Sequence, residues 1–138
     1  RYTEGMEYGV HTDTPVMGSQ TPMRVDVSCT IFLSESDSYD GGELILVTPG
    51  GERSYKAERG AACIYPTHYS HRVAKVTRGE RRAVVVFMQS QVPDAGKRAI
   101  MADIASALET FTETDVDQEA LESLIRGYYN LARRWTQV

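Results

Sequence analysis

The chain has 138 residues, which is enough for one globular domain with a single hydrophobic core. Hydrophobic residues make up 41% and charged residues 25%, a composition typical of an ordered protein and not of a disordered one. The formal net charge of -4 excludes the strongly basic character of a typical nucleic-acid-binding domain. No apolar run approaches the roughly 20 residues that span a bilayer, and no signal-peptide pattern is present, so we expect no membrane association and a cytoplasmic location.

The first candidate site lies in the stretch YGVHTDTP, residues 8–15, which is predicted to be a strand that ends in a proline turn. Residues two apart in an extended chain point to the same face, so His11 and Asp13 would offer an imidazole and a carboxylate to the same ion. The alternative is a pair of polar residues on a solvated strand edge. The following loop, residues 14–23, contains two prolines and one glycine and is predicted to form a mobile lid.

Residues 24–88 contain β-branched and aromatic runs separated by glycine-rich turns. This pattern predicts six or seven short antiparallel strands in a barrel or double-sheet sandwich. In RVDVSCTIFLS, residues 24–34, apolar side chains alternate with a second, mostly uncharged face that suits the wall of a cavity, formed by Asp26, Ser28, Thr30 and Phe32. The sequence TRGER, residues 77–81, is predicted to be a tight turn between two strands.

After Pro93 the hydrophobic period changes, and apolar residues recur at helical spacing at Ile100, Ile104, Ala107 and Leu108. Thr114 and Asp117 resemble a capping box in front of a second helix. That helix carries one apolar stripe, formed by Leu121, Leu124, Ile125, Tyr128, Leu131, Ala132 and Trp135. We therefore expect a β core over residues 1–92 and a helical extension over residues 93–138 that packs on the core.

A third candidate ligand is His71, which opens a predicted strand sixty positions after His11. In a closed barrel, strands far apart in sequence can face each other. Two histidines and one carboxylate form a facial triad, which suits Fe(II) and leaves coordination positions open, whereas zinc more often takes four ligands or keeps one water. His68 is the competing ligand, but it lies in a predicted turn, while His71 shares a strand face with Val73.

Arg81 is a candidate for binding a second group in the same place. It is predicted to begin the strand that follows the turn, on the same face as Ala83. Arginine binds a carboxylate through two parallel hydrogen bonds and stays charged when buried, so it fits a dicarboxylate co-substrate. Arg78 has the same spacing from His68 and is the alternative, but its place in the predicted turn favours exposure to solvent.

Together these residues resemble the Fe(II)- and 2-oxoglutarate-dependent dioxygenases of the prolyl 4-hydroxylase type, and among them the bacterial PKHD-type hydroxylases. The order His11, Asp13, His71 and Arg81 carries the resemblance, with Tyr2 and Tyr8 and the segments YDGGEL, HRVAKVTRGER and GYYNLARRW. It covers nearly the whole chain, although such enzymes usually have a helix and strands upstream of the point where this sequence begins. The resemblance implies a mainly β protein with a double-stranded β-helix (jelly-roll) core and two C-terminal helices.

The resemblance also implies roles for individual residues. His11, Asp13 and His71 would bind Fe(II) as catalytic ligands, and Arg81 would bind the distal carboxylate of 2-oxoglutarate with help from Tyr2 and Ser28. The implied reaction is hydroxylation of a small-molecule or peptidyl substrate with O2, which converts 2-oxoglutarate to succinate and CO2. L-ascorbate is a further implied cofactor.

Two other functions compete with this one, and the oligomeric state stays open. A non-catalytic module of the same fold could sense iron or 2-oxoglutarate, and a structural jelly roll could lack both ligands. Formation of succinate separates the enzyme from the sensor. An inward-facing Arg81 separates both from the structural protein, which has no use for a buried guanidinium.

Overall fold

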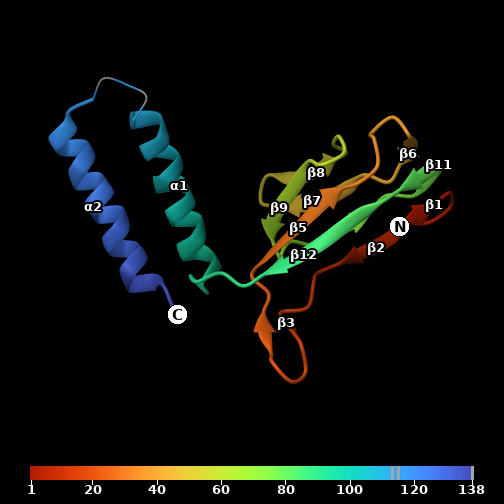
Figure 1. Ribbon diagram of the computed structural model, residues 1–138, viewed down its shortest axis with the longest axis horizontal. Helices are drawn as coiled ribbons and strands as arrows, with labels where there is room; N and C mark the ends of the chain where they lie inside the picture. The colour runs from red at the N-terminus through yellow and green to blue at the C-terminus, as the bar shows by residue number, and fades with distance from the viewer. Residues whose placement is uncertain (113, 115, 138) are drawn as a thin grey trace. The chain divides into compact units, whose positions relative to one another are not determined.

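The computed structural model describes residues 1–112, 114 and 116–137 of the chain. It divides into two compact units, Arg1–Gln89 and Ser90–Val138. The described part of the first unit contains twelve strands, and that of the second contains two α-helices (Figure 1).

Four strand groups make up the first unit. The strands are β1 (Tyr2–Thr3), β2 (Tyr8–His11), β3 (Val16–Met17), β4 (Met23–Arg24), β5 (Val27–Phe32), β6 (Tyr39–Gly41), β7 (Leu44–Thr48), β8 (Gly51–Tyr55), β9 (Ala62–Pro66), β10 (His71–Val73), β11 (Val76–Arg81) and β12 (Ala83–Met88). They form a four-stranded sheet in the order β2-β10-β7-β8, two three-stranded sheets, β12-β5-β9 and β1-β11-β6, and the β3-β4 hairpin. The pairings in these sheets are antiparallel, as predicted, but the strands are more numerous because several have only two or three residues.

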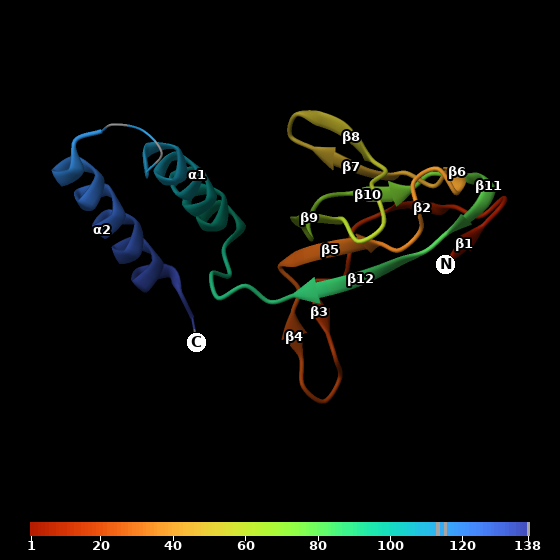
Figure 2. The same ribbon diagram turned by 45° about the horizontal axis from the view of Figure 1, so that its top comes forward.

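The two larger sheets, β2-β10-β7-β8 and β12-β5-β9, lie one above the other in Figure 2. Leu44 and Leu46 of β7 pack with Tyr65 of β9 in a cluster that joins the two sheets, and each of the three side chains is at most 3% exposed. Burying an apolar side chain of this size contributes roughly 1.5–3 kcal/mol. This cluster fixes the two sheets at the spacing that leaves the cavity described below.

Strand β5 presents the uncharged polar face that the sequence predicts. Ser28, Thr30 and Phe32 are 0%, 2% and 1% exposed, whereas Leu33, just beyond the strand, is 41% exposed. Because alternate residues of a strand point to opposite faces, the three buried side chains lie on one side of the sheet. Thr30 lines the cavity between the sheets, as its position predicts.

The predicted tight turn at residues 77–81 is wrong, because these residues belong to strand β11, which pairs with both β1 and β6. Gly79 has the positive φ expected of a turn glycine, but here it allows two strands to approach closely. A Cβ on Gly79 would lie 2.3 Å from the carbonyl oxygen of Ser38. Arg81 therefore ends β11, and the corner to β12 is formed by the single residue Arg82.

The predicted loop at residues 14–23 contains a hairpin. Strands β3 and β4 pair Val16 with Arg24 and Met17 with Met23, and the hairpin projects away from the other strands (Figures 1 and 2). Its role as a lid stays a prediction.

The second unit contains the two predicted helices, α1 (Ala95–Thr112) and α2 (Gln118–Trp135). The predicted capping box is wrong, because Asp117 is itself the N-cap residue of α2 and Thr114 does not cap this helix. Asp117 caps α2 by accepting a hydrogen bond from the backbone N–H of Glu119, but the Thr114 hydroxyl donates instead to the carbonyl oxygens of Thr110 and Phe111 in α1. Within the described residues, neither helix is long and apolar enough to cross a membrane.

The apolar stripe of α2 is buried at one position among those described. Leu121 is 7% exposed, whereas Leu124 is 49% exposed. Trp135 is half-buried, with the ammonium of Lys97 lying 5.7 Å from its ring centroid. Leu121 is therefore the main packing residue of this helix.

We expect Leu121→Ala to lower the free energy of unfolding of the helical unit by about 2–3 kcal/mol, because it removes a buried side chain and leaves a cavity. Leu124→Ala is the matched control: the same substitution on the same helix at a half-exposed position should cost less than half as much. Chemical denaturation followed by helix circular dichroism measures both. Equal losses would show that Leu124 is covered in solution.

Candidate metal and co-substrate site

His11 and His71 are brought together by strand pairing. They are direct partners in the antiparallel pair of β2 and β10, so both side chains lie on the same face of the sheet. Their ring centroids are 4.2 Å apart. One strand pairing thus brings together two histidines that are sixty positions apart in the sequence.

Each of the two imidazole rings is held by its own backbone. Nδ1 of His11 donates a hydrogen bond to the carbonyl oxygen of Gly9 at 2.9 Å, and Nδ1 of His71 donates to that of Tyr69 at 3.0 Å. Because a carbonyl only accepts hydrogen bonds, the Nδ1 atom of each ring carries a proton, and in the neutral form of the ring Nε2 then has the free lone pair. A lone pair of this kind is the donor that a metal ion requires.

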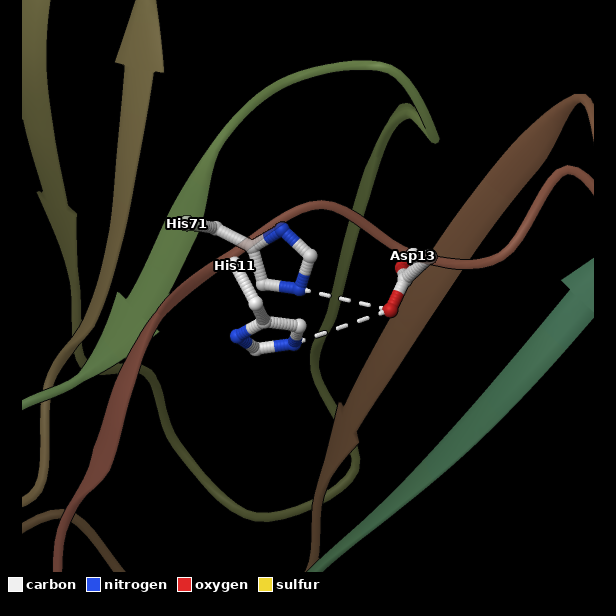
Figure 3. A group of neighbouring side chains, drawn as sticks. All are labelled: His11, Asp13 and His71. Atoms are coloured by element: carbon white, nitrogen blue, oxygen red, sulfur yellow. Dashed lines mark ion pairs between the residues drawn. The ribbon is translucent and has the colours of Figure 1, made fainter.

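Asp13 completes the group from outside the strand. The prediction that the strand continues through Asp13 is wrong, since β2 ends at His11. The chain nevertheless turns so that Oδ1 of Asp13 lies 3.7 Å from Nε2 of His11 and 3.6 Å from Nε2 of His71 (Figure 3). The three candidate ligand atoms all lie within 4.8 Å of one another. Two imidazole nitrogens and one carboxylate oxygen are the donors of a facial triad, so the residues fit Fe(II).

His68 lies apart from this group. Its side chain is exposed, its ring packs edge-on against Tyr69, and it borders a different cavity, of about 410 Å³, on the side of Thr12 and Pro15. Among the described residues, the metal-ligating group contains His71 and not His68.

A cavity of about 340 Å³ lies between the two larger sheets and contains the three candidate ligands. This size is within the range of small-molecule sites, roughly 300–1,000 Å³. Its wall includes side chains from both sheets and from β1 and β11, namely Tyr2, Thr30, Leu44, Tyr65, Val73, Arg81, Ala83, Val85 and Phe87. Residues from distant parts of the sequence therefore line one cavity.

Arg81 is buried in the wall of this cavity at 3% exposure. Within the described part of the chain its Nε has no hydrogen-bond partner, and no carboxylate forms an ion pair with its guanidinium. Burial lowers the pKa of Arg81, with opposing effects from the nearby hydroxyls of Tyr39, Tyr2 and Tyr65. A buried cation without an acidic partner is costly, so the cavity fits an anionic ligand such as the carboxylate of 2-oxoglutarate.

Arg78 points to a different environment. Its side chain is 59% exposed, and its Nε donates to Oδ2 of Asp40 at 2.6 Å. This hydrogen bond raises the pKa of Arg78. Arg78 is therefore a surface residue with an acidic partner. This agrees with the exposure to solvent that the sequence predicted.

Tyr2 lies beside Arg81, and its expected help in binding 2-oxoglutarate stays a prediction. The two residues are partners in the β1-β11 pair, and the guanidinium carbon lies 5.6 Å from the centroid of the Tyr2 ring. Burial raises the pKa of the Tyr2 hydroxyl, and the charge of Arg81 lowers it in part. At neutral pH a neutral phenol can donate a hydrogen bond to an anion in the cavity.

Ser28 does not lie beside Arg81. Its hydroxyl donates to Oδ2 of Asp13 at 2.8 Å, and it does not line the cavity that contains Arg81. The structure therefore gives no support to the predicted contact of Ser28 with the distal carboxylate of 2-oxoglutarate. Alternation along β5 identified the correct face, but it does not say how far along the strand a ligand lies.

Sequence reasoning missed Tyr65, which is 3% exposed and packs with its ring centroid 5.1 Å from that of His71. Burial raises the pKa of its hydroxyl, and a hydrogen bond with Thr30 lowers it in part. Strand alternation could have identified it: Ile64 and Tyr65 are neighbours in a predicted strand and point to opposite faces, so one of the two had to face inward.

Two histidines and one carboxylate around one cavity are the ligand set found in non-haem Fe(II) oxygenases. The family model of the 2OG-Fe(II) oxygenase superfamily matches residues 1–89. The chain belongs to this superfamily.

Similar curated proteins are bacterial and carry the name PKHD-type hydroxylase. The chain is 46% identical over 135 residues to one from Parvibaculum lavamentivorans, an alignment that covers 98% of the chain and 60% of that protein. It is 39% identical over 139 residues to one from Cupriavidus metallidurans, covering 99% of the chain and 61% of that protein. The chain thus spans about three-fifths of the length of these relatives.

Two solved structures share the fold. One is an oxidoreductase of the 2OG-Fe(II) oxygenase family from Burkholderia pseudomallei, with a TM-score of 0.51, 22% identity and coverage of 62% of this chain and 38% of that one. The other is a prolyl-4-hydroxylase from Pseudomonas putida, with a TM-score of 0.52, 24% identity and coverage of 64% and 48%. At these identities the likeness concerns the fold alone.

Proposed function

We propose that this chain forms the catalytic part of an Fe(II)- and 2-oxoglutarate-dependent hydroxylase, which uses O2 to hydroxylate a substrate and releases succinate and CO2. One observation carries the proposal. The three metal-ligand candidates share a cavity with Arg81, a buried cation that lacks an acidic partner among the described residues. A structural protein would have no reason to bury that charge.

The residues of the cavity would have separate roles in binding the metal and the co-substrate. His11 and His71 supply neutral Nε2 donors whose orientation is fixed by their backbone hydrogen bonds, and Asp13 supplies Oδ1 and a negative charge. Arg81 binds the distal carboxylate of 2-oxoglutarate and so orients its 2-oxo acid end. When bound, the iron supplies the activation of O2 that drives the oxidative decarboxylation of 2-oxoglutarate.

Tyr2, Phe32 and Tyr65 would keep water away from this pair of charges. The guanidinium carbon of Arg81 lies 5.6 Å and 5.8 Å from the ring centroids of Tyr2 and Phe32. Excluding water strengthens the attraction between the guanidinium and a carboxylate, because the local dielectric constant falls. The aromatic rings would thus increase the affinity for the co-substrate.

The β unit is proposed to be a double-stranded β-helix, or jelly roll, with residues 1–92 as the dioxygenase core and residues 93–138 as a helical extension. Membership of the superfamily and the opposed antiparallel sheets support this assignment. A peptidyl or free amino-acid side chain stays the expected substrate, as the resemblance of the sequence to prolyl 4-hydroxylases implies. Use of L-ascorbate and a cytoplasmic location stay predictions.

Succinate formation tests the proposed function. The chain is incubated with Fe(II), 2-oxoglutarate and O2, and succinate is measured with and without lysate as a source of substrate, together with a mass-spectrometric search for a product 16 Da heavier. We expect release of succinate that requires iron and is lost in Asp13→Ala. Binding of 2-oxoglutarate without any succinate would favour the sensing module, and failure to bind either ligand would exclude both functions.

Gly42 provides a separate test of the role of Arg81. Its φ is +69°, and a Cβ there would lie 3.0 Å from Cδ of Arg81. We expect Gly42→Ala to displace the guanidinium and raise the 2-oxoglutarate concentration for half-maximal succinate release about tenfold, with Fe(II) affinity unchanged, since an off-rotamer side chain costs on the order of 1 kcal/mol.

Gly51→Ala is the matched control for this experiment. Gly51 also has a positive φ, of +99°, but a Cβ there meets nothing within 4 Å. It therefore reproduces the backbone strain without the contact with Arg81. An equal effect of both substitutions would mean that strain alone, and not displacement of Arg81, changes the affinity.

A further inference from the structure

The two carboxylate oxygens of Asp13 have different surroundings. Oδ1 faces Nε2 of both histidines, at 3.7 Å from that of His11 and 3.6 Å from that of His71. Oδ2 accepts a hydrogen bond from the hydroxyl of Ser28 at 2.8 Å. The carboxylate is thus held between the metal-ligating group on one side and strand β5 on the other.

Ser28 is itself held by a second hydroxyl. Its Oγ lies 3.1 Å from Oγ1 of Thr67, and Ser28 and Thr67 are 0% and 4% exposed. The Ser28 proton is already donated to Asp13, so the Thr67 hydroxyl must be the donor in the second bond. Two consecutive buried hydrogen bonds therefore run in one direction, from the Thr67 hydroxyl to Ser28 and from the Ser28 hydroxyl to Asp13.

The backbone that carries each of the two hydroxyls is held by hydrogen bonds to neighbouring segments. Ser28 lies on β5, the central strand of its sheet, and pairs with residues of β12 and β9 on either side. Thr67 follows β9 directly, and its N–H donates to the carbonyl oxygen of Asp26 at 3.2 Å. Asp13 has no such support from its own segment, because β2 ends two residues earlier.

We propose that Ser28, supported by Thr67, is the positioning residue for Asp13 and makes it present a single oxygen to the metal. This inference rests on the proposed function. A carboxylate can bind a metal through one oxygen or through two. With Oδ2 engaged by Ser28, the protein supplies three donor atoms, and the coordination position that a second oxygen would take stays open for 2-oxoglutarate or O2.

Metal affinity measured without O2 tests this role, with Fe(II) and with Co(II) as a spectroscopic substitute. We expect Ser28→Ala to bind either ion 10- to 100-fold more weakly, the usual effect of losing a residue that orients a ligand. Its Co(II) absorption spectrum should also differ from that of the wild type, because the bands depend on coordination number. Ser28→Thr, which keeps the hydroxyl, should restore the wild-type spectrum.

Two controls separate positioning from packing. Ser34→Ala removes a similar serine hydrogen bond, to the carbonyl oxygen of Glu80 at 2.9 Å, and should leave metal affinity and spectrum unchanged. Thr67→Val should weaken binding about threefold, but should add nothing in the Ser28→Ala background, because Thr67 acts through Ser28. Additive effects in the double variant would contradict the claim that Thr67 acts through Ser28.

The outcomes distinguish this inference from the proposed function. Failure of the wild type to bind metal would refute the proposed function itself. Normal affinity and an unchanged spectrum in a folded Ser28→Ala variant would overturn the positioning role alone. If Ser28→Ala does not fold, Thr67→Val is compared with Thr67→Ser: weaker binding only in the valine variant supports the role, and equal binding overturns it.

Discussion

His11→Ala, Asp13→Ala and His71→Ala should each abolish stoichiometric binding of Fe(II). The three ligand atoms form one group within 4.8 Å, and removing any one leaves two protein donors, which is an incomplete facial site. The variants should still fold, because each substitution is at the wall of a cavity. Calorimetric titration of the protein with Fe(II) in the absence of O2 measures the effect.

His68→Ala is the control for the ligand assignment. Its side chain is exposed and outside the group, so iron affinity should stay at the wild-type value. Normal iron binding by His71→Ala together with loss of binding by His68→Ala would transfer the ligand role to His68. That result would also require a different path for the chain between β9 and β10.

Arg81→Ala should raise the 2-oxoglutarate concentration needed for half-maximal succinate release about a hundredfold, with Fe(II) binding unchanged. The buried guanidinium would form charge-assisted hydrogen bonds with the distal carboxylate, and losing them costs roughly 3 kcal/mol. Arg81→Lys should recover only part of the affinity, since an ammonium cannot form the same two parallel bonds. Succinate release is measured against 2-oxoglutarate concentration.

Arg78→Ala is the control for Arg81, because it removes a mostly exposed guanidinium three positions earlier in the same strand. It should change the affinity for 2-oxoglutarate little. If Arg78→Ala were the impaired variant instead, the register of β11 against β6 would be wrong. An unchanged response in both variants would remove the main support for a dicarboxylate co-substrate.

The sequence predicted the metal-ligating group better than it predicted the strands that carry it. His11 and His71 are ligand candidates by residue type, and the β pattern indicated that distant strands can face each other. Their pairing across β2 and β10 satisfies that expectation. Asp13 does lie beside His11, but not for the reason that the sequence suggested. Strand alternation cannot explain its position, because β2 ends at His11. A hydrogen bond from Ser28 to its carboxylate holds it instead.

The wrong turn prediction at Gly79 and the unforeseen contact of Ser28 with Asp13 have a common physical origin. A glycine among charged residues is typical of a turn, but the same freedom of φ permits a close contact between strands, and only the neighbouring strand decides between them. Similarly, alternation shows which face Ser28 occupies, whereas its partner depends on the register of β5 against other segments. Both are tertiary properties that a single sequence does not contain.

The two helices were predicted from their period, but the burial of the stripe was not. A 3.6-residue repeat of apolar positions establishes that a helix has a packing face. It does not establish how much of that face is covered, and Leu121 and Leu124 differ widely in exposure although both lie on the predicted stripe. The difference depends on the residues that surround each leucine in the folded chain, which no periodicity identifies.

Binding of 2-oxoglutarate in the absence of O2 is the most direct measurement of the proposed site, because it requires the metal ligands and Arg81 together and no substrate. We expect one molecule of 2-oxoglutarate to bind per chain when Fe(II) is present, and binding to be lost when the metal is removed or when Arg81 is replaced by alanine. Binding that is unaffected by both changes, or no binding by the iron-loaded wild type, would contradict the assignment of this cavity.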